Sequence, residues 1–270
     1  MTTSPGQELV LSNLQDGVLC VEFNRPERRN ALSLEMERAY VETMLAAADD
    51  PAVRVIVLTG RGPAFCAGLD LTLLEGLASG APRAAKLRRH AFLTELPKPV
   101  LAAVNGAAIG AGFVMALMCD LRFVGAGTKI GAGTARLGLP AEYGTDWLLA
   151  RSVGLARAFE ILASGRLYSG AEAERLGLAN QVFPDDELLP RTLEFARELA
   201  SQCSPRSLAM IKRQLNRCLT GSLEAAYALG ERLIVRSVTA PDFQEAMAAR
   251  QARRAPVYPG LGPATEWWTD

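Results

Sequence analysis

The chain has 270 residues, 49% of them hydrophobic, which is enough to bury the core of one large domain or two small ones. Its 29 Lys and Arg residues balance 29 Asp and Glu residues, so no overall field attracts nucleic acid or an anionic membrane surface. Any anionic ligand must therefore be held by local groups. With a single histidine and five cysteines that show no CxxC spacing, the composition excludes a histidine-rich metal site.

The start of the chain, MTTSPGQELV, lacks the basic residues and apolar core of a signal peptide. The cysteines are typical of reduced, mostly buried thiols, and these features together predict a cytoplasmic protein. The single histidine, His90, follows two arginines on a predicted helix, where a solvated or simply packed ring is expected.

The first ordered element expected is a strand over 18–23, after a disordered start. The polar loop that follows contains Arg25, Arg28 and Arg29. These arginines could bind phosphate, or the loop could simply be solvated, and composition does not decide between the two.

The next segment predicts a helix and a strand. Ser33 is a typical helix N-cap, and the apolar spacing after it predicts a helix that ends at Asp49-Asp50-Pro51. A strand over 53–58 follows. It leads into a turn of small residues in which Asp70 stands where another helix can begin.

The stretch from 99 to 119 carries no charge, a length that could suit a membrane helix. Asn105 and three glycines interrupt it, which would be costly in lipid and unfavourable for a straight helix. The better interpretation is a buried strand over 100–104, a turn, and a central helix through 113–118 that begins in a glycine-rich turn. The free N–H groups of such a helix start can hold an anion, or an oxygen that becomes one.

Two central units share one order of elements: a strand, then Thr59-Gly60 or Asn105-Gly106, then a glycine-containing turn and a helix. They lie about 46 residues apart, a period that predicts a superhelical stack of β-β-α turns. Further strands are expected over 121–124 and 178–183, the second after a short helix that ends at Gly177.

From residue 187 the pattern changes to helices alone, each with one charged and one apolar face. We therefore divide the chain into a core, 1–186, and a helical assembly region with a C-terminal tail, 187–270. The tail contains Trp267-Trp268 and is interpreted as a strap against a neighbour rather than a nucleotide-stacking site.

Several short segments carry a resemblance to a known family: AFCAGLDL at 64–71, AAVNG at 102–106, GAG at 110–112, CD at 119–120, and the segment from NRP to NAL at 24–32. From about residue 10 to residue 254, the chain resembles the crotonase (enoyl-CoA hydratase/isomerase) superfamily. The resemblance implies an α/β fold, namely a spiral of β-β-α turns with a C-terminal helical trimerisation region. It also implies a coenzyme A thioester as substrate, no further cofactor, and a homotrimer or hexamer.

By position in the family motif, the backbone N–H groups of Leu69 and Ala111 form an oxyanion hole for the thioester oxygen of an enolate. Many members have glycine where this chain has Ala111, a mild change because only the N–H is used. The resemblance further implies contacts with the substrate and its coenzyme A moiety by Arg25, Arg28, Arg29, Ala31, Leu32, Ala67, Asp70, Leu71 and Gly110. Asp70 is expected to cap a helix rather than to react.

The acid/base residues depart from the family's hydratases, which place two glutamates around one water. The corresponding residues here are Val114 and Thr134, neither of which exchanges protons usefully. Glu142 matches the catalytic acid of one branch of enoyl-CoA isomerases, although without the resemblance it would be taken for an exposed loop carboxylate. Asp146 could be a second acid, but a helix-start or surface role suits it better.

Three interpretations remain open at this point. The first, which we favour, is a double-bond isomerase of enoyl-CoA that uses Glu142. The second is a hydratase or related lyase of the same fold that uses other groups, and the third is an acyl-CoA-binding protein without catalytic activity.

Overall fold

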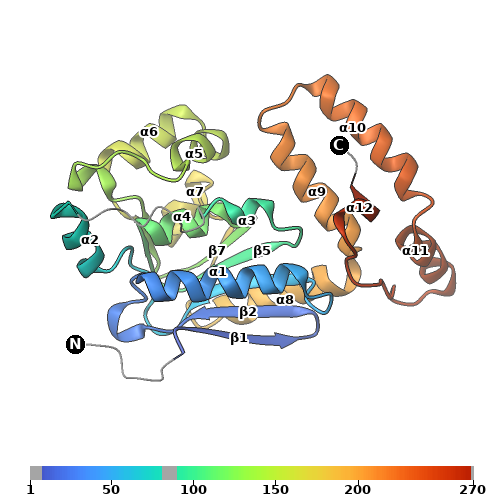
Figure 1. The fold of residues 1–270 in the computed structure, drawn as a ribbon, viewed down its shortest axis with the longest axis horizontal. Helices are drawn as coiled ribbons and strands as arrows, with labels where there is room; N and C mark the ends of the chain where they lie inside the picture. The colour runs from blue at the N-terminus through green and yellow to red at the C-terminus, as the bar shows by residue number, and fades with distance from the viewer. Residues whose placement is uncertain (1–7, 81–89, 269–270) are drawn as a thin grey trace.

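The computed structural model describes residues 8–80 and 90–268 and contains two sheets covered by helices (Figure 1). The larger, six-stranded sheet has the order β1-β2-β3-β5-β7-β10, and the smaller, four-stranded sheet has the order β4-β6-β8-β9. The strands of the larger sheet are β1 (Val10–Gln15), β2 (Val18–Phe23), β3 (Val55–Gly60), β5 (Val100–Val104), β7 (Leu121–Gly125) and β10 (Gln181–Phe183). Those of the smaller sheet are β4 (Ala64–Cys66), β6 (Ala107–Ile109), β8 (Lys129–Gly131) and β9 (Tyr168–Ser169).

The predicted spiral of β-β-α turns is confirmed. One turn contains β3, β4 and α2 (Leu71–Ala78), and the next contains β5, β6 and α4 (Ala111–Met118). Corresponding strands pair in parallel, β3 with β5 and β4 with β6. The Asn105 side chain ties the two turns together, because it donates to the Gly60 and Gly62 carbonyls and accepts from the Gly60 N–H.

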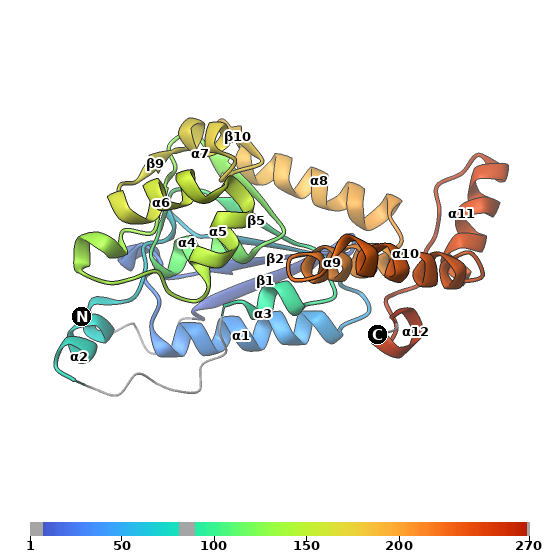
Figure 2. The ribbon, with the colours of Figure 1, turned by 90° about the horizontal axis from the view of Figure 1, so that it is seen from above.

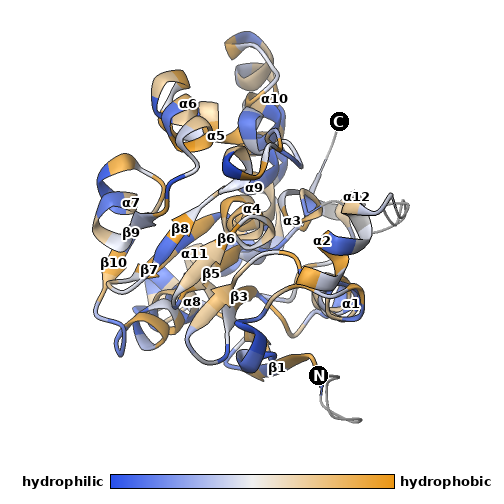
Figure 3. Ribbon diagram, turned by 90° about the vertical axis from the view of Figure 1, so that its left-hand side faces the viewer, coloured by the Kyte–Doolittle hydropathy of each residue, from blue (hydrophilic) through white to orange (hydrophobic). Residues whose placement is uncertain are grey.

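The remaining helices are η1 (Pro26–Arg28), α1 (Leu34–Asp49), α3 (Phe92–Glu95), η2 (Thr134–Leu137), α5 (Thr145–Val153), α6 (Leu155–Ser164), α7 (Gly170–Leu176), α8 (Leu188–Gln202), α9 (Pro205–Cys218), α10 (Leu223–Ser237), α11 (Pro241–Ala252) and α12 (Ala264–Trp267). Ser33 caps α1 as predicted, accepting from the Met36 N–H at 3.2 Å. The predicted central helix is α4, whose residues are all buried, and Figure 3 draws it largely in the hydrophobic colours.

The larger sheet is covered on both faces, with α1 on one side and α8 on the other (Figure 2). Successive side chains of a strand point to opposite faces, so Ile56 and Leu58 pack in the cluster that contains α1. Val55 and Val57 face the other way and pack with the apolar side of α8. The division of the chain at residue 187 into a core and an assembly region stays a prediction. The first helix after this residue, α8, packs on the larger sheet.

The helices α9 to α11 extend away from the two sheets (Figures 1 and 2). A buried cation fastens α9 to the core: the Lys212 Nζ lies 2.8 Å from a carboxylate oxygen of Asp120 and donates to the Leu93 and Lys98 carbonyls. The tail packs on this chain's own α9 and α10, because Trp267 and Trp268 share a buried cluster with them. This differs from the predicted strap against a neighbour.

Several elements were not predicted from the sequence, among them β1, α5, α6 and the four short strands of the smaller sheet. β1 is mostly exposed and is held by pairing along the whole length of β2, so its own residues give little hydrophobic pattern. The strand expected over 178–183 begins at Gln181, because Leu178 and Ala179 bond back to the end of α7. Within the described residues, no helix combines the length and the apolar character that a membrane crossing requires.

Candidate active site

The first candidate hydrogen-bond donor to a thioester oxygen is the N–H of Leu69, and a single β-bridge fixes the direction of this N–H. Leu69 pairs in parallel with Leu32, whose N–H donates to the Gly68 carbonyl at 2.8 Å and whose carbonyl accepts from the Asp70 N–H at 3.0 Å. Because the residues on either side of Leu69 make these bonds, its own N–H points away from the bridge. Leu69 also lines the cavity described below.

The second candidate donor is the N–H of Ala111, the first residue of α4. An N–H at this position has no acceptor within its own helix. Gly112 lets the helix start close to β4, because a Cβ there would lie 2.0 Å from the Cys66 carbonyl oxygen. Gly110 has φ 54°, and a Cβ on it would lie 3.9 Å from the Cα of Gly68, so the two turns lie side by side.

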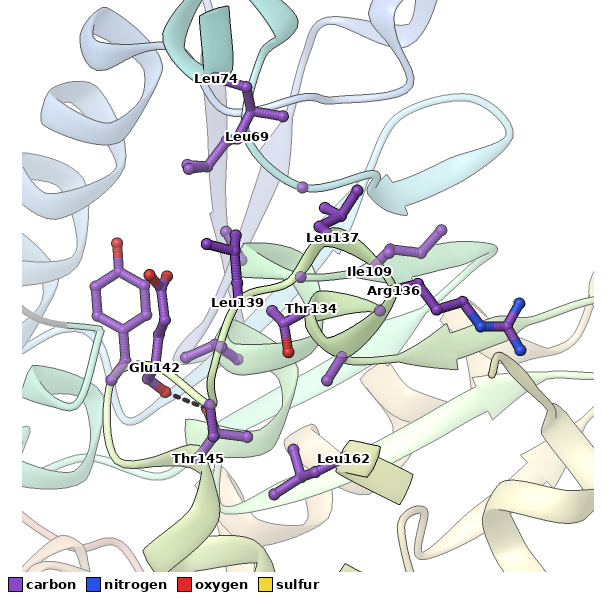
Figure 4. Close-up of a pocket in the computed structure, with 18 of the residues that line it drawn as sticks. Leu69, Leu74, Ile109, Thr134, Arg136, Leu137, Leu139, Glu142, Thr145 and Leu162 are labelled. Atoms are coloured by element: carbon purple, nitrogen blue, oxygen red, sulfur yellow. Dashed lines mark hydrogen bonds between the residues drawn. The ribbon is translucent and has the colours of Figure 1, made fainter. Parts of the chain in front are cut away.

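Both turns line one cavity of about 270 Å³, whose wall is mostly apolar (Figure 4). The residues that line it are Ala67, Gly68, Leu69, Leu74, Ile109, Gly110, Ala111, Val114, Ala132, Gly133, Thr134, Arg136, Leu137, Leu139, Ala141, Glu142, Tyr143, Thr145 and Leu162. Among these described residues, Glu142 contributes the one carboxylate. The arrangement can therefore oppose negative charge on an oxygen and exchange a proton nearby.

Glu142 lies half-buried on the loop between η2 and α5. Its carbonyl oxygen accepts from the N–H of Thr145 at 3.0 Å and from the Thr145 hydroxyl at 2.6 Å. Tyr143, the next residue, has φ 58° and packs its ring against the buried ring of His90, with 5.0 Å between the ring centres. His90 is thus a packed ring, as the sequence suggested.

The two residues at the hydratase glutamate positions, Val114 and Thr134, both line the cavity. Val114 is buried on α4 and Thr134 begins η2. Asp146 is exposed in the first turn of α5 and is absent from the cavity wall, which fits the helix-start role expected for it.

The three arginines of the loop over 24–30 differ in burial. Arg25 is buried, and its Nη1 donates to the Asp70 carboxylate at 3.0 Å and to the Ala31 carbonyl at 2.7 Å. Arg28 and Arg29 are exposed. Asp70 also accepts from the Thr72 N–H at 3.1 Å, which is the helix-capping role expected of it.

The other predicted contact residues occupy several environments. Ala67 and Gly110 line the cavity, whereas the Leu32 side chain belongs to the core and Leu71 is 71% exposed. We expect the length of the pocket to depend on the segment over 73–93, of which 81–89 lie outside the described residues. Leu74 from this segment lines the cavity.

Sequence reasoning missed several wall residues: Ile109, Arg136, Leu137, Thr145 and Leu162. Leu162 comes from α6, whose apolar spacing could have revealed the helix but not its position beside the cavity. Arg136 lies at the edge, where its Nε donates to the Ser164 carbonyl at 3.1 Å and its guanidinium points away from Thr134 (Figure 4). Among residues 8–80 and 90–268, no cluster of three His, Cys, Asp or Glu side chains could hold a metal ion.

A spiral of β-β-α turns that brings two helix-start turns to one apolar cavity defines a class of protein suited to binding an apolar group and to opposing negative charge beside it. Residues 13–260 match the family model described as enoyl-CoA hydratase/isomerase. The chain therefore belongs to this family, the crotonase superfamily, whose members act on acyl-CoA thioesters.

Relatives named as hydratases and a relative named as an isomerase match nearly the full length of the chain. A "Probable enoyl-CoA hydratase echA12" of Mycobacterium bovis is 38% identical over 257 residues, covering 88% of each chain. The 1,2-epoxyphenylacetyl-CoA isomerase of Escherichia coli is 34% identical over 263 residues, covering 94% of this chain and 99% of the relative. A crystal structure of a probable enoyl-CoA hydratase/isomerase from Mycobacterium abscessus matches with a TM-score of 0.86 and 31% identity, covering 93% of this chain and 99% of that one.

Proposed function

We propose that this protein moves a double bond within an enoyl-CoA, with Glu142 as the proton shuttle. The observation that carries the proposal is the composition of the cavity: of the described residues that line it, Glu142 supplies the one carboxylate. Val114 and Thr134 line the same cavity at the positions where a hydratase of the family has its two glutamates.

The chemistry requires one base and one oxyanion site. The Glu142 carboxylate takes a proton from C2 of a 3-enoyl thioester, and the electron pair of that C–H bond moves onto the thioester oxygen. The N–H groups of Leu69 and Ala111 oppose the charge that develops there, each contributing roughly 3 to 4 kcal/mol in the transition state. The protonated Glu142 then returns the proton at C4, and the double bond re-forms between C2 and C3, so the atoms balance without water.

The apolar wall supports this reaction. Figure 4 draws Leu139 between Glu142 and Thr134, and Leu74, Leu137 and Leu162 complete a surface suited to a hydrocarbon chain. Excluding water from such a site strengthens the electrostatic interactions with the enolate and suppresses competing hydration.

We infer that coenzyme A is the carrier of the acyl group and that no further cofactor takes part. Arg28 and Arg29 are exposed on the loop that precedes Ala31, so they suit the phosphates of the nucleotide end. Arg25, Leu32, Asp70 and Leu71 remain proposed as neighbours of the substrate; among them, Arg25 and Asp70 bond to each other. We also propose that the reaction takes place in the cytoplasm.

Two other functions compete with the isomerase. Hydratase is the name most of the similar proteins carry, and the 2,3-dehydroadipyl-CoA hydratase of Escherichia coli is 34% identical over 257 residues. Hydration, however, needs a second group to hold and split water. A binder without catalytic activity would show acyl-CoA affinity and no turnover.

The test is conversion of 3-enoyl-CoA substrates of several chain lengths, followed by the absorbance of the conjugated thioester. Glu142→Gln should lower kcat by about 100-fold or more, because it keeps the shape and removes the base. Asp146→Asn is the matched control, since it removes an exposed carboxylate four residues away and should leave kcat within about twofold.

If the wild type is inactive at every chain length, catalysis is refuted and the interpretation as an acyl-CoA-binding protein without catalytic activity remains. A Glu142→Gln variant that keeps most of the isomerase rate would refute the shuttle. Hydration of 2-enoyl-CoA that survives Glu142→Gln would favour the hydratase and another acid.

A further inference from the structure

The loop that carries Glu142 has an unusual backbone. Tyr143 has φ 58° and Gly144 has φ 75°, so two consecutive residues are left-handed directly after Glu142. Glycine adopts this conformation readily, but tyrosine is unfavourable there because its Cβ approaches the backbone. Strain of this kind persists only where surrounding contacts hold it, and it is concentrated at functional sites.

The contact that closes this turn is made by Thr145. Both its N–H, at 3.0 Å, and its hydroxyl, at 2.6 Å, donate to the carbonyl oxygen of Glu142. Thr145 is 2% exposed, so water does not compete well for either bond. Figure 4 shows the hydroxyl bond joining the two residues at the base of the Glu142 side chain.

A general capping role does not account for this hydroxyl. The N-cap residue of α5 is Gly144, and α5 has no side-chain cap hydrogen bond. A capping threonine accepts a bond from an N–H further along its helix. The Thr145 hydroxyl instead donates backwards, out of the helix, to Glu142, the residue that supplies the one carboxylate among the described residues of the cavity wall.

We propose that Thr145 is a positioning residue, which fixes the main chain of Glu142 so that its carboxylate is held at the reacting carbons. The proposal rests on the function proposed above for Glu142. Two bonds to one carbonyl stop the Glu142 peptide from rotating, and the packed Tyr143 and His90 rings hold the other side of the turn. Thr145 acts through Glu142 and takes no part in the proton transfer.

The test compares two substitutions at Thr145 with a matched control. Thr145→Val keeps the shape and removes the hydroxyl, and Thr145→Ser keeps the hydroxyl. The control is Thr192→Val in α8, where an equally buried hydroxyl donates to the Leu188 carbonyl at 2.8 Å on a helix that covers the larger sheet.

Thr145→Val should lower kcat by about tenfold, because small misplacements of a catalytic group are costly to the rate. KM, and the Kd for the unreactive ligand acetoacetyl-CoA, should stay within about twofold of wild type. Thr145→Ser should restore kcat to within about twofold, and Thr192→Val should leave kcat unchanged whatever it does to Tm. If Thr145→Val does not fold, Thr145→Ala removes the same hydroxyl and carries the same expectation.

A double variant shows whether Thr145 acts through Glu142. In the Glu142→Gln background, adding Thr145→Val should lower the residual rate by less than about twofold, because the group it positions is already disabled. A further tenfold loss would overturn the proposal. So would a rise in KM at unchanged kcat, which would make Thr145 a substrate contact.

The two proposals fail in distinguishable ways. A wild-type kcat in Thr145→Val, together with a large loss in Glu142→Gln, would overturn the positioning role and leave the shuttle intact. A wild-type rate in Glu142→Gln would overturn the shuttle, and the positioning role would fall with it.

Discussion

Replacing Arg25 with methionine tests how much the ion pair between Arg25 and Asp70 contributes to the stability of the fold. Arg25 is 7% exposed, and its Nη1 bridges the Asp70 carboxylate and the Ala31 carbonyl. Methionine keeps most of the apolar stem and removes the charge. It leaves the Asp70 carboxylate without its cation and the Ala31 carbonyl without this donor.

The expected loss of stability follows from these contacts. Removing one partner of a fully buried ion pair costs about 3–5 kcal/mol. The Asp70 side chain is 17% exposed and keeps its bond from the Thr72 N–H, so water and this N–H offset part of the loss. We therefore expect the free energy of unfolding to fall by about 2–3 kcal/mol.

The measurement is urea unfolding at pH 7. The slope of the free energy of unfolding against urea concentration should be equal in the variants, which would show that unfolding exposes the same amount of surface in each. Arg28→Met is the matched control, because Arg28 is exposed on the same loop and should cost less than about 0.5 kcal/mol. A loss below about 0.5 kcal/mol in Arg25→Met would refute the reasoning, since the pair would then contribute nothing measurable.

The effect should also depend on pH. Burial acts to raise the pKa of the Asp70 carboxyl, but the Thr72 N–H and the Arg25 guanidinium together hold this pKa below its ordinary value of 3.8. A carboxyl whose pKa is lower in the folded state stabilises the fold above its unfolded pKa and loses this contribution as the pH falls through the folded value. The difference between wild type and Arg25→Met should therefore be full at pH 7 and shrink below about pH 4.

The remaining predictions concern the substrate site and the helical region. Ala111→Pro removes the N–H that we propose as the second donor to the thioester oxygen. Proline is tolerated at a first helical position, so the protein should still fold while kcat falls by about 100-fold or more. A rate within tenfold of wild type would argue against this donor. Arg28→Gln and Arg29→Gln should each raise KM for an acyl-CoA by a few fold at unchanged kcat, and an unchanged KM for both would move the phosphate site elsewhere. Light scattering at micromolar concentration should give a homotrimer or hexamer, because α9–α11 expose apolar side chains, and a monomer would contradict an assembly role for these helices. Arg254 donates to Glu245, as does the Val257 N–H, and these bonds lower the Glu245 pKa to about 2, so NMR titration should find its carboxyl still ionised at pH 3.

The sequence by itself determined the features that depend on near neighbours. Ser33 caps α1 where predicted, and Gly177 ends α7 in the left-handed conformation. The repeat of strand, turn and helix was visible because each unit carries its own turn residues. Helix caps and turns involve residues within about four positions of each other, so the local sequence contains the information they need.

The tertiary structure decided what depends on distant partners. The three arginines of one loop look equivalent in sequence, yet Arg25 turns inward to Asp70, 45 residues away. The Leu69 N–H takes its direction from a bridge to Leu32, and the cavity wall includes Leu162, whose position beside the cavity the local sequence does not indicate. Several side chains of one type can look alike in the sequence. Which of them is buried depends on surfaces that meet only after the chain has folded, so it is determined by packing and not by local conformational preference.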